Sequence, residues 1–545
     1  MTVKDSSTVN KYANYGVSPE IKKPTLQHCI TESESDEEDE ESALLMKKTV
    51  LSKARSSWWQ RGMRDVNSLM DFFGMVRDES AQSLLLDELY EIISLSGPII
   101  GTYLFEMFPE FVSIALVGHM DSPMSGKYMA AAALSMMFKN MVAIYPGFGL
   151  SSAMDTLCTQ ACGANEMQLM GTILQTGCIV LSAVSVITFV LCFFCTEVLI
   201  FLGQPKHVAE LAGDFTTYLL PGIPFLFLYE LLRKVLQAQN VATPMFYVSM
   251  VSNILNIGLG YYLVNFTFWG FLGAAVARTV ASVTLPCLLL AYLFYEKKCI
   301  KSFWHGWHLK NAINGIPIFL SLGIPGMLQI GLEWWAYELL TVVCGWLPDG
   351  VTALGANAVA QNVTSITSMI YWGTSIAGNV RIGQALGAGL VVRAKAISNL
   401  VIGVSAIMSI IVGASILAYR SVLPQLFTND STIHDLSVSL LSISAVIQLS
   451  DALNGAIQGI FRGSGRQALG AKMFFVAYSI IGLPLGCLLC FELNLGVIGL
   501  WLGMLTGGFI VALWGWYEVS KSNWSQLVRN AQTLIEASVA QEVIV

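Results

Sequence analysis

Charged residues are scarce in this sequence. Asp, Glu, Lys and Arg make up 12% of its 545 residues, whereas hydrophobic residues make up 54%. An average soluble domain is about 25% charged, and half that supply cannot cover a surface that faces water. The composition therefore excludes an ordinary soluble protein and predicts a chain embedded in a lipid bilayer, with no nucleic-acid partner.

The short motifs of common enzymes are also absent. The sequence contains no GxxxxGK[ST], HExxH or GxSxG, so neither a P-loop ATPase nor a zinc protease or serine hydrolase is indicated. Its 11 cysteines show no metal or disulfide spacing, and most lie in apolar stretches, where cysteine serves as a small apolar residue. We expect no enzyme, metal or cofactor, and expect an ion gradient rather than ATP as the energy source.

Long apolar stretches dominate the chain after residue 90. A bilayer core about 30 Å thick requires roughly 20 apolar residues per helix, and continuous rather than alternating runs argue against a β-barrel. We therefore predict an all-α polytopic membrane protein with twelve spans, near residues 92–118, 128–157, 170–196, 207–232, 243–265, 270–295, 313–345, 353–380, 396–419, 433–461, 468–491 and 496–518.

The N-terminal segment is polar and shows no signal peptide. Eight of the ten residues from Glu32 to Glu41 are acidic, which is typical of disorder. Glu40, Leu44 and Leu45 resemble an acidic dileucine signal that a sorting adaptor would bind on the way to a vacuole or lysosome, and a chance match is the alternative interpretation. Residues 56–90 mix aromatic and basic residues, as interfacial helices do.

The distribution of Lys and Arg predicts the orientation, because cytosolic loops carry the excess. With both termini cytosolic, the predicted inner loops contain Arg233, Lys234, Lys297, Lys298, Lys301, Lys310, Arg381, Arg393, Lys395, Arg462 and Arg466. The predicted outer loops contain only Lys127, Lys206 and Arg420. Asn265 and Asn429 begin glycosylation sequons in outer loops, which agrees with this orientation. The membrane of residence, vacuolar, lysosomal or plasma, stays open.

An internal repeat divides the spans into two halves. GLSSAMDTLCTQACGA at Gly149–Ala164 aligns with GTSIAGNVRIGQALGA at Gly373–Ala388, with seven identities and an offset of 224 residues (373 − 149). Two later landmarks keep nearly this offset. We predict two pseudo-symmetric bundles of six helices and the following organisation: an N-terminal tail at 1–85, a first bundle at 86–296, a basic loop at 297–312, a second bundle at 313–520 and a C-terminal tail at 521–545.

Ionisable residues inside a span usually face a cavity and mark function. The seventh predicted span contains Glu333, Trp334, Tyr337 and Glu338. On a helix Glu333 and Tyr337 share a face, whereas Glu338 points about 140° away by 3.6-residue geometry and would serve a neighbouring contact. Loss of water disfavours the charged form of a carboxyl, so Glu333 could exchange a proton, and indole rings suit organic cations.

Other ionisable residues lie in the remaining spans. Asp451 has no basic residue within ten positions on either side, so its partner would come from another helix, water or substrate. In the first half, Glu106, Lys139 and Asp155 lie in or near the first two spans. Lys139 could form a structural pair with Glu106, the interpretation we favour, or could shape a cavity for an anionic substrate.

Four segments together resemble the multidrug and toxic compound extrusion (MATE) family, eukaryotic branch. They are Val117-Gly118-His119, SSAMDTLCTQACGA, GLEWWAYELL, and VRIGQALGAG together with FRGSGRQALGA. The resemblance spans about residues 85–520. It implies proton-coupled export of organic compounds, with functional carboxylates at Glu333, Glu338 and Asp451 and a tyrosine at Tyr337. Asn362 departs from the glutamate of animal members, and Ser113 from the aspartate of bacterial ones.

The resulting hypothesis is a monomeric proton-coupled antiporter that exports organic cations or amphiphilic metabolites. Three alternatives stay open. One is an exporter of organic anions such as citrate or phenolic conjugates, in which Lys139 and Arg381 would help. The others are a flippase for lipid-linked precursors and a receptor or channel scaffold that does not transport.

Overall fold

The computed structural model of the protein describes residues 79–120, 124–428 and 430–543. The acidic segment, the motif of Glu40, Leu44 and Leu45, most of residues 56–90, and Asn429 lie outside these residues. Ser83–Val545 forms one compact unit, and the description below concerns this unit. Across the described ranges every regular element is a helix.

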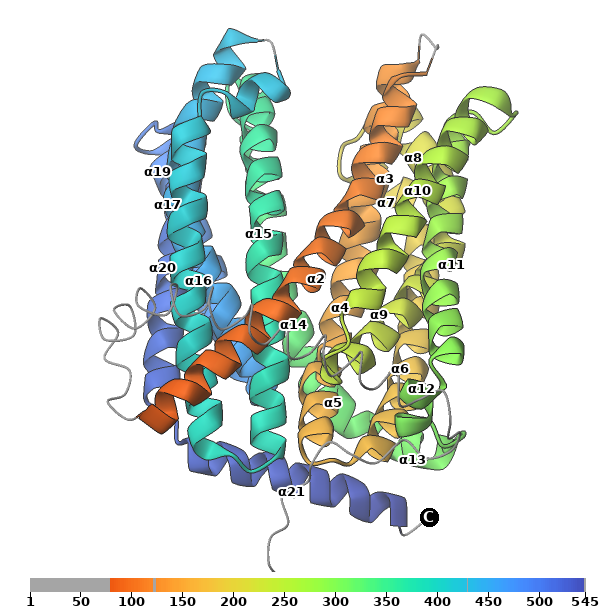
Figure 1. The fold of residues 1–545 in the computed structure, drawn as a ribbon. Coiled ribbons are helices and arrows are strands. Elements are labelled where there is room, and N and C mark those ends of the chain that lie inside the picture. The colour runs from red at the N-terminus through yellow and green to blue at the C-terminus, as the bar shows by residue number, and fades with distance from the viewer. Residues whose placement is uncertain (1–78, 121–123, 429, 544–545) are drawn as a thin grey trace, which may run out of the picture. The chain divides into compact units, whose positions relative to one another are not determined.

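The helices of the first half begin with α2 and end with α11 (Figure 1). Their bounds are α2 Glu79–Gly118, α3 Ser125–Lys139, the π-helix η1 Asn140–Ile144, α4 Tyr145–Ser151, α5 Ala153–Gly163, α6 Met167–Phe193, α7 Cys195–Phe201, α8 Lys206–Leu219, the 3-10 turn η2 Leu220–Gly222, α9 Ile223–Ala238, α10 Thr243–Phe266 and α11 Phe271–Tyr295.

The second half repeats this order after a connection that contains α12 Lys297–Phe303 and α13 Leu309–Asn314. Its elements are α14 Ile316–Cys344, α15 Gly350–Gly387, α16 Val391–Tyr419, the 3-10 turn η3 Leu423–Leu426, α17 Ser431–Gly463, α18 Gln467–Phe474, the π-helix η4 Phe475–Gly482, α19 Leu483–Phe491 and α20 Gly496–Ser520, followed by α21 Trp524–Val543.

Each of the twelve predicted spans falls on a helix or on a series of consecutive helices in the described part of the chain. Ten of these are long and apolar enough to cross a membrane by length and composition. The other two are residues 125–163 and α15. The first is interrupted by η1 and by a break at Ser152, and α15 carries polar side chains such as Asn357 and Gln361. Both contribute to the polar interior described below, which explains their lower apolar content.

The first long helix of each half contacts both bundles. On α2, the Tyr103 ring lies 6.4 Å from the Trp372 ring of α15, and the Phe105 ring lies 5.3 Å from Phe246 of α10. On the other side of the repeat, α14 packs against α4 of the first half and α18 of its own half. Figure 1 shows α2 running obliquely across the helices of both halves. These two helices therefore join the bundles.

Matching glycines of the repeat allow this close packing. A Cβ on Gly149 would lie 2.3 Å from the Met327 backbone of α14, and a Cβ on Gly373 would lie 2.3 Å from Ile100 of α2. Small residues let helix backbones approach within a bilayer. Because Gly149 and Gly373 are equivalent in the repeat, the two contacts are equivalent as well, and the sequence repeat is expressed as a structural pseudo-symmetry.

A second pair of contacts, the repeat crossing of Gln160, Gly163, Gln384 and Gly387, joins α5 to α15. A Cβ on Gly163 would lie 2.1 Å from the backbone oxygen of Gln384, and a Cβ on Gly387 would lie 2.0 Å from that of Gln160. The glutamines are equivalent to each other in the repeat, as are the glycines. The two copies of the motif therefore cross each other reciprocally.

Two segments predicted as a loop and a tail contain helices. The connection 297–312 includes α12 and the start of α13 and packs on α6, where Gln175 donates to the Gly306 carbonyl over 2.8 Å and accepts from the His308 amide over 2.7 Å. The C-terminal tail includes α21, which contacts α5 and α13 as well as α15 and α16. Apolar Trp524, Val528, Ala531 and Ile535 on α21 are buried, which is why this segment docks.

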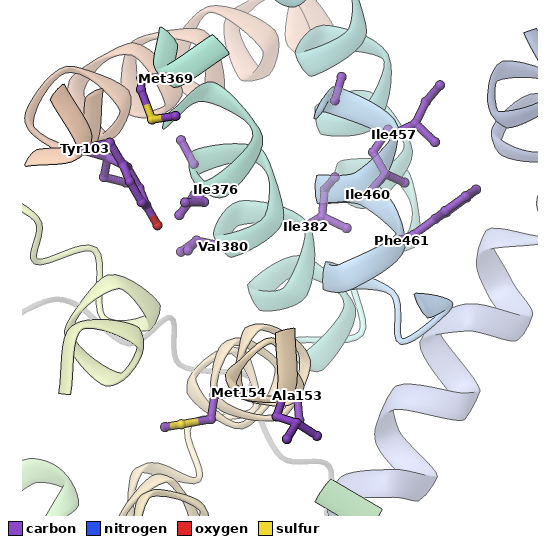
Figure 2. Packing of buried hydrophobic residues seen from close by; sticks show 14 of the residues in the cluster. Tyr103, Ala153, Met154, Met369, Ile376, Val380, Ile382, Ile457, Ile460 and Phe461 are labelled. Carbon is purple, nitrogen blue, oxygen red and sulfur yellow. The ribbon is translucent and has the colours of Figure 1, made fainter. Parts of the chain in front are cut away.

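The apolar core continues from one half into the other. Figure 2 shows Tyr103 of α2 beside Met369, Ile376 and Val380 of α15, with Ile457 and Ile460 of α17 on the far side of α15. These side chains are all buried. The core thus fixes α2, α15 and α17 together and holds the polar residues of the cavity in place.

Candidate functional site

A cavity of about 540 Å³ lies between the two halves of the unit. It is lined by α2, α3, η1, α4, α9, α10 and α11 of the first half, and by α14, α15 and α17 of the second. Seven charged side chains face it, namely Glu106, Glu110, Lys139, Arg278, Glu333, Glu338 and Asp451. A volume of this size accommodates a drug-sized molecule.

The second half contributes an acidic wall of Glu333, Glu338 and Asp451. Glu333 Oε2 accepts a hydrogen bond of 2.9 Å from Gln458 Nε2 of α17. Within the described residues, none of the three carboxyl groups has a Lys, Arg or His nitrogen within 4.0 Å. The acidic wall is therefore not neutralised by protein side chains and is available to a cation or a proton.

The position of Glu338 corrects the expectation from helix geometry. An angle of about 140° from Glu333 predicts a separate contact for Glu338, but Glu338 lines the same cavity. The reason is that α14 lies between the halves, so the cavity extends around more than one face of this helix. Tyr337 also lines the cavity, but Glu333 is hydrogen-bonded by Gln458 rather than by the Tyr337 phenol.

Aromatic rings form a continuous band beside the acidic wall. The Trp334 ring lies 4.8 Å from Tyr145 of α4 and 6.0 Å from Trp372 of α15 in an edge-to-face arrangement. Trp372 in turn contacts Tyr103 of α2, and all four rings line the cavity. Faces of Trp and Tyr attract organic cations, and this band brings them to the cavity from both halves.

The first half contributes Lys139, Arg278, Glu110 and Asn140, here called the first-half wall, to the lining of the same cavity. The expected structural pair of Lys139 with Glu106 is wrong. Glu106 instead accepts hydrogen bonds from Arg233 over 2.6 and 2.8 Å and from the Tyr229 phenol over 2.9 Å. Nη1 of Arg233 donates to both oxygens of the Glu106 carboxylate while Nη2 pairs with Glu230, so this guanidinium already occupies the carboxylate with charge-assisted hydrogen bonds.

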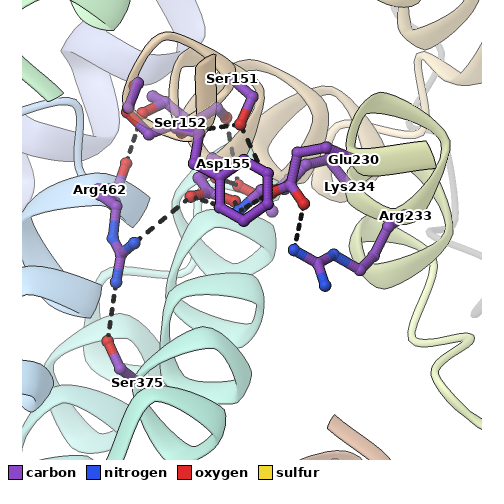
Figure 3. A network of polar contacts seen from close by, with 12 residues as sticks. Ser151, Ser152, Asp155, Glu230, Arg233, Lys234, Ser375 and Arg462 are labelled. Atoms are coloured by element: carbon purple, nitrogen blue, oxygen red, sulfur yellow. Dashed lines mark hydrogen bonds and ion pairs between the residues drawn. The ribbon is translucent and has the colours of Figure 1, made fainter. Parts of the chain in front are cut away.

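Asp155, another candidate for the cavity, lies away from it in a buried ionic network (Figure 3). Lys234 Nζ lies 2.8 Å from its Oδ1, and Arg462 Nη1 lies 3.8 Å from its Oδ2. Arg462 also donates to Ser375 Oγ over 3.0 Å. Because Lys234 belongs to the first half and Arg462 to the second, Asp155 joins the two halves electrostatically.

Four of the basic residues assigned to inner loops instead lie inside the helix bundle. Arg233 and Lys234 are buried in α9 beside Glu230, with which Arg233 forms an ion pair and whose Oε1 lies 3.7 Å from Lys234. Arg462 is buried in α17, and Arg381 in α15 forms an ion pair of 2.9 Å with Glu88 of α2. Carboxylates from distant helices neutralise these cations, which a loop assignment from sequence alone could not foresee. Arg381 is also not among the residues that line the cavity.

Replacing Asp155 by asparagine is expected to lower the free energy of unfolding by about 3 kcal/mol. The loss leaves buried Arg462 without a counter-charge among the described residues and leaves Lys234 only the Glu230 carboxylate at 3.7 Å. Thermal unfolding of the purified protein in detergent would measure this change. Asp435→Asn is the matched control, since the Asp435 side chain is 85% exposed and surface pairs contribute little. Equal melting temperatures of the two variants would contradict the assigned role of Asp155.

Other predicted positions are placed as follows. Asn362 lines the cavity, and Asn265 is exposed at the end of α10, where its amide donates to the Tyr261 carbonyl over 2.9 Å. Arg278 and Gln458 were missed by the sequence analysis. Arg278 could have been found, because it is an ionisable residue within the apolar run 271–295. Gln458 carries no charge and has no comparable signal.

Comparison with known proteins connects this arrangement to one family. The sequence profile of the MatE family matches residues 98–262 and again residues 325–488. The two matches begin 227 residues apart (325 − 98), close to the offset of the internal repeat. This confirms that the chain is built from two copies of one unit.

Curated relatives and solved structures agree with this match. The multidrug and toxin extrusion protein 1 of Oryctolagus cuniculus is 33% identical over 446 residues, which cover 82% of this chain and 77% of the relative. The human protein of the same name is 31% identical over 451 residues, covering 83% and 78%. The crystal structure of the eukaryotic MATE transporter AtDTX14 aligns with a TM-score of 0.78 at 29% identity, covering 83% of this chain and all of that one.

A more distant structure shares the fold. The Vibrio cholerae MATE transporter VcmN in the bent form aligns with a TM-score of 0.70 at 18% identity, covering 83% of this chain and 99% of that one. The all-α architecture of twelve membrane helices is thereby confirmed for this chain.

Proposed function

The chain belongs to the MatE family and is a multi-pass membrane transporter rather than an enzyme; from this premise we propose that it exports organic cations or amphiphilic compounds in exchange for protons. The proposal rests on the acidic wall of Glu333, Glu338 and Asp451. This wall has no ion-pair partner among the residues that the structure describes, and it lies beside a band of aromatic rings. A cavity with this lining suits a ligand that is positively charged and aromatic or aliphatic.

Competition between proton and substrate for the acidic wall supplies the coupling. A carboxyl in a site with little water favours its neutral form unless a cation compensates the charge. Protonation of Glu333 or Asp451 would release a bound organic cation, and arrival of a cation would favour release of the proton. Exchange follows because the acidic wall binds either the proton or the organic cation, and binding of one makes the binding free energy of the other less favourable.

One end of the unit, called the closed end below, is held together by contacts between the two halves, which supports alternating access. Hydrogen bonds between the halves gather near α5, where Gln160 donates to the Gly463 carbonyl over 3.0 Å, Gln384 donates to the Ala238 carbonyl over 2.8 Å and Thr156 accepts from Gln467 over 2.6 Å. The C-terminal helix α21, which contacts α5 and α13, and the basic segment 297–312 would place this end in the cytosol. On this assignment the conformation would be the outward-facing one, and loosening of these contacts would open the cytosolic path.

Transport by purified protein in proteoliposomes tests the proposal. With the membrane potential clamped, a gradient of one pH unit exchanged for one proton per cation supports about tenfold accumulation of tetraethylammonium, since one unit is worth about 1.4 kcal/mol. Protein-free liposomes and collapse of the gradient with a protonophore are the controls. Uptake that does not depend on the pH gradient would refute proton exchange. Uptake of organic anions alone would favour the alternative of an organic-anion exporter.

In this proposal the N-terminal segment determines the membrane in which the protein resides. An adaptor that recognises Glu40, Leu44 and Leu45 would direct the protein to a vacuole or lysosome, and the plasma membrane is the destination without it. In either location the cavity of the outward-facing state would open to the acidic compartment, which is the side from which a proton must enter to drive export.

A further inference from the structure

The first-half wall of the cavity carries a pair of cations that the proposed exchange of protons and organic cations does not use. Lys139 at the end of α3 is only 6% exposed, and it lines the cavity. Arg278 reaches the same cavity from α11. Both lie within membrane-spanning stretches, where an unused charge is costly.

Neither cation is neutralised by an ion pair. Within the described residues no carboxylate oxygen lies within 4.0 Å of the Lys139 or Arg278 nitrogens, and Nη1 of Arg278 is buried without any hydrogen-bond partner. The ordinary outcome for a buried guanidinium is a carboxylate or phosphate partner. A structural role would therefore leave Arg278 unsatisfied.

The nearby carboxylates do not fill this role. Glu106 is engaged by Arg233 and Tyr229, and Glu110 lies beside the Asn140 amide at 3.4 Å. One remaining carboxylate, Glu110, thus stands near two cations. With Glu106 paired to Arg233, the first-half wall keeps two cations and one carboxylate, and it lines the same cavity as the acidic wall.

We propose that Lys139 and Arg278 bind an anionic group, a carboxylate in the first instance, of a substrate whose cationic group lies against the acidic wall. The preferred substrate class is then amphoteric, with a basic nitrogen and a carboxylate several bonds apart, rather than a simple organic cation. A planar guanidinium can bind a carboxylate through two parallel hydrogen bonds, and the ammonium adds a point charge. This inference rests on the proposed function for the location of the substrate, but not on proton coupling.

Equilibrium binding to the purified full-length protein separates the two walls. The probes are tritiated benzyltrimethylammonium and its 4-carboxy derivative, which differ only in the carboxylate. The wild-type protein is expected to bind the carboxy derivative more tightly. Arg278→Gln is expected to raise the dissociation constant of the carboxy derivative about tenfold relative to that of benzyltrimethylammonium. This factor corresponds to the loss of one charge-assisted hydrogen bond.

Controls keep the result interpretable. Arg420→Gln removes an exposed arginine that bonds Ser442 over 2.8 Å and should leave the ratio unchanged. If Arg278→Gln does not fold, Lys139→Gln gives the same test, and Lys139→Arg should restore most of the preference. A ratio that stays constant in the Arg278 and Lys139 variants, including one in which both constants rise together, would overturn the proposal and indicate a structural role.

The two proposals fail in different assays. If the wild-type protein shows no gradient-driven uptake of tetraethylammonium, the proton exchange is refuted. The ratio of the two dissociation constants would still test the anion subsite. An unchanged binding ratio would refute the anion subsite even if tetraethylammonium is exchanged for protons.

Discussion

Replacing Glu333 by glutamine is expected to abolish accumulation driven by a pH gradient, so that the ratio of inner to outer tetraethylammonium falls from about tenfold toward one. Glutamine has nearly the same shape as glutamate, and its carbonyl can still accept the hydrogen bond from Gln458 Nε2 that Glu333 accepts over 2.9 Å. It cannot carry a proton. The substitution therefore removes proton exchange while the packing of α14 against α17 is kept.

Substrate counterflow distinguishes lost coupling from lost binding. Exchange of labelled for unlabelled tetraethylammonium needs no gradient, and we expect Glu333→Gln to retain it. Glu492→Gln is the matched control, because Glu492 is exposed between α19 and α20 and should behave like the wild type. Accumulation that persists in Glu333→Gln would contradict proton exchange through this residue and would direct the same test to Asp451→Asn.

The helices and their order could be predicted from the sequence because the bilayer imposes a length. A continuous apolar run of about 20 residues has few alternatives to a spanning helix, and the repeat could be seen because small residues at close helix contacts leave a recognisable pattern. Gly149 and Gly373 are examples, since each lies against the backbone of a crossing helix. Such constraints are local or periodic and are therefore visible in one sequence.

The partners of the charged residues could not be predicted in the same way. Arg233 and Glu106 are 127 residues apart, and Arg381 and Glu88 are 293 apart. Loops were the simplest assignment for basic residues that follow an apolar run, but carboxylates on other helices draw these residues into the protein. Glu338 shows the same limit, because one helix face cannot reveal how far a cavity extends around the helix.

Adding a methyl group at the repeat crossing is expected to have a large effect on the closed end. A Cβ on Gly387 would stand 2.0 Å from the Gln160 backbone oxygen, whereas real Cβ contacts are essentially never under 3.0 Å. Relief requires α5 and α15 to separate, which would also disturb the reciprocal contact of Gly163 with Gln384. We expect Gly387→Ala to cost the closed conformation about 1–3 kcal/mol, as overpacking does elsewhere, although alanine usually stabilises a helix relative to glycine.

Cys162 reports this opening directly. Its sulfur lies 3.9 Å from Gln384 Nε2 across the crossing, so separation of α5 from α15 should raise its rate of alkylation by N-ethylmaleimide about fivefold or more, by the conversion of 1 kcal/mol to a population ratio. Peptide mass spectrometry would follow this cysteine among the others. Gly403→Ala is the control, since a Cβ there meets nothing within 4 Å. Equal rates in both variants would show that the crossing does not hold the closed end, and the alternating access proposed above would then need another point of closure.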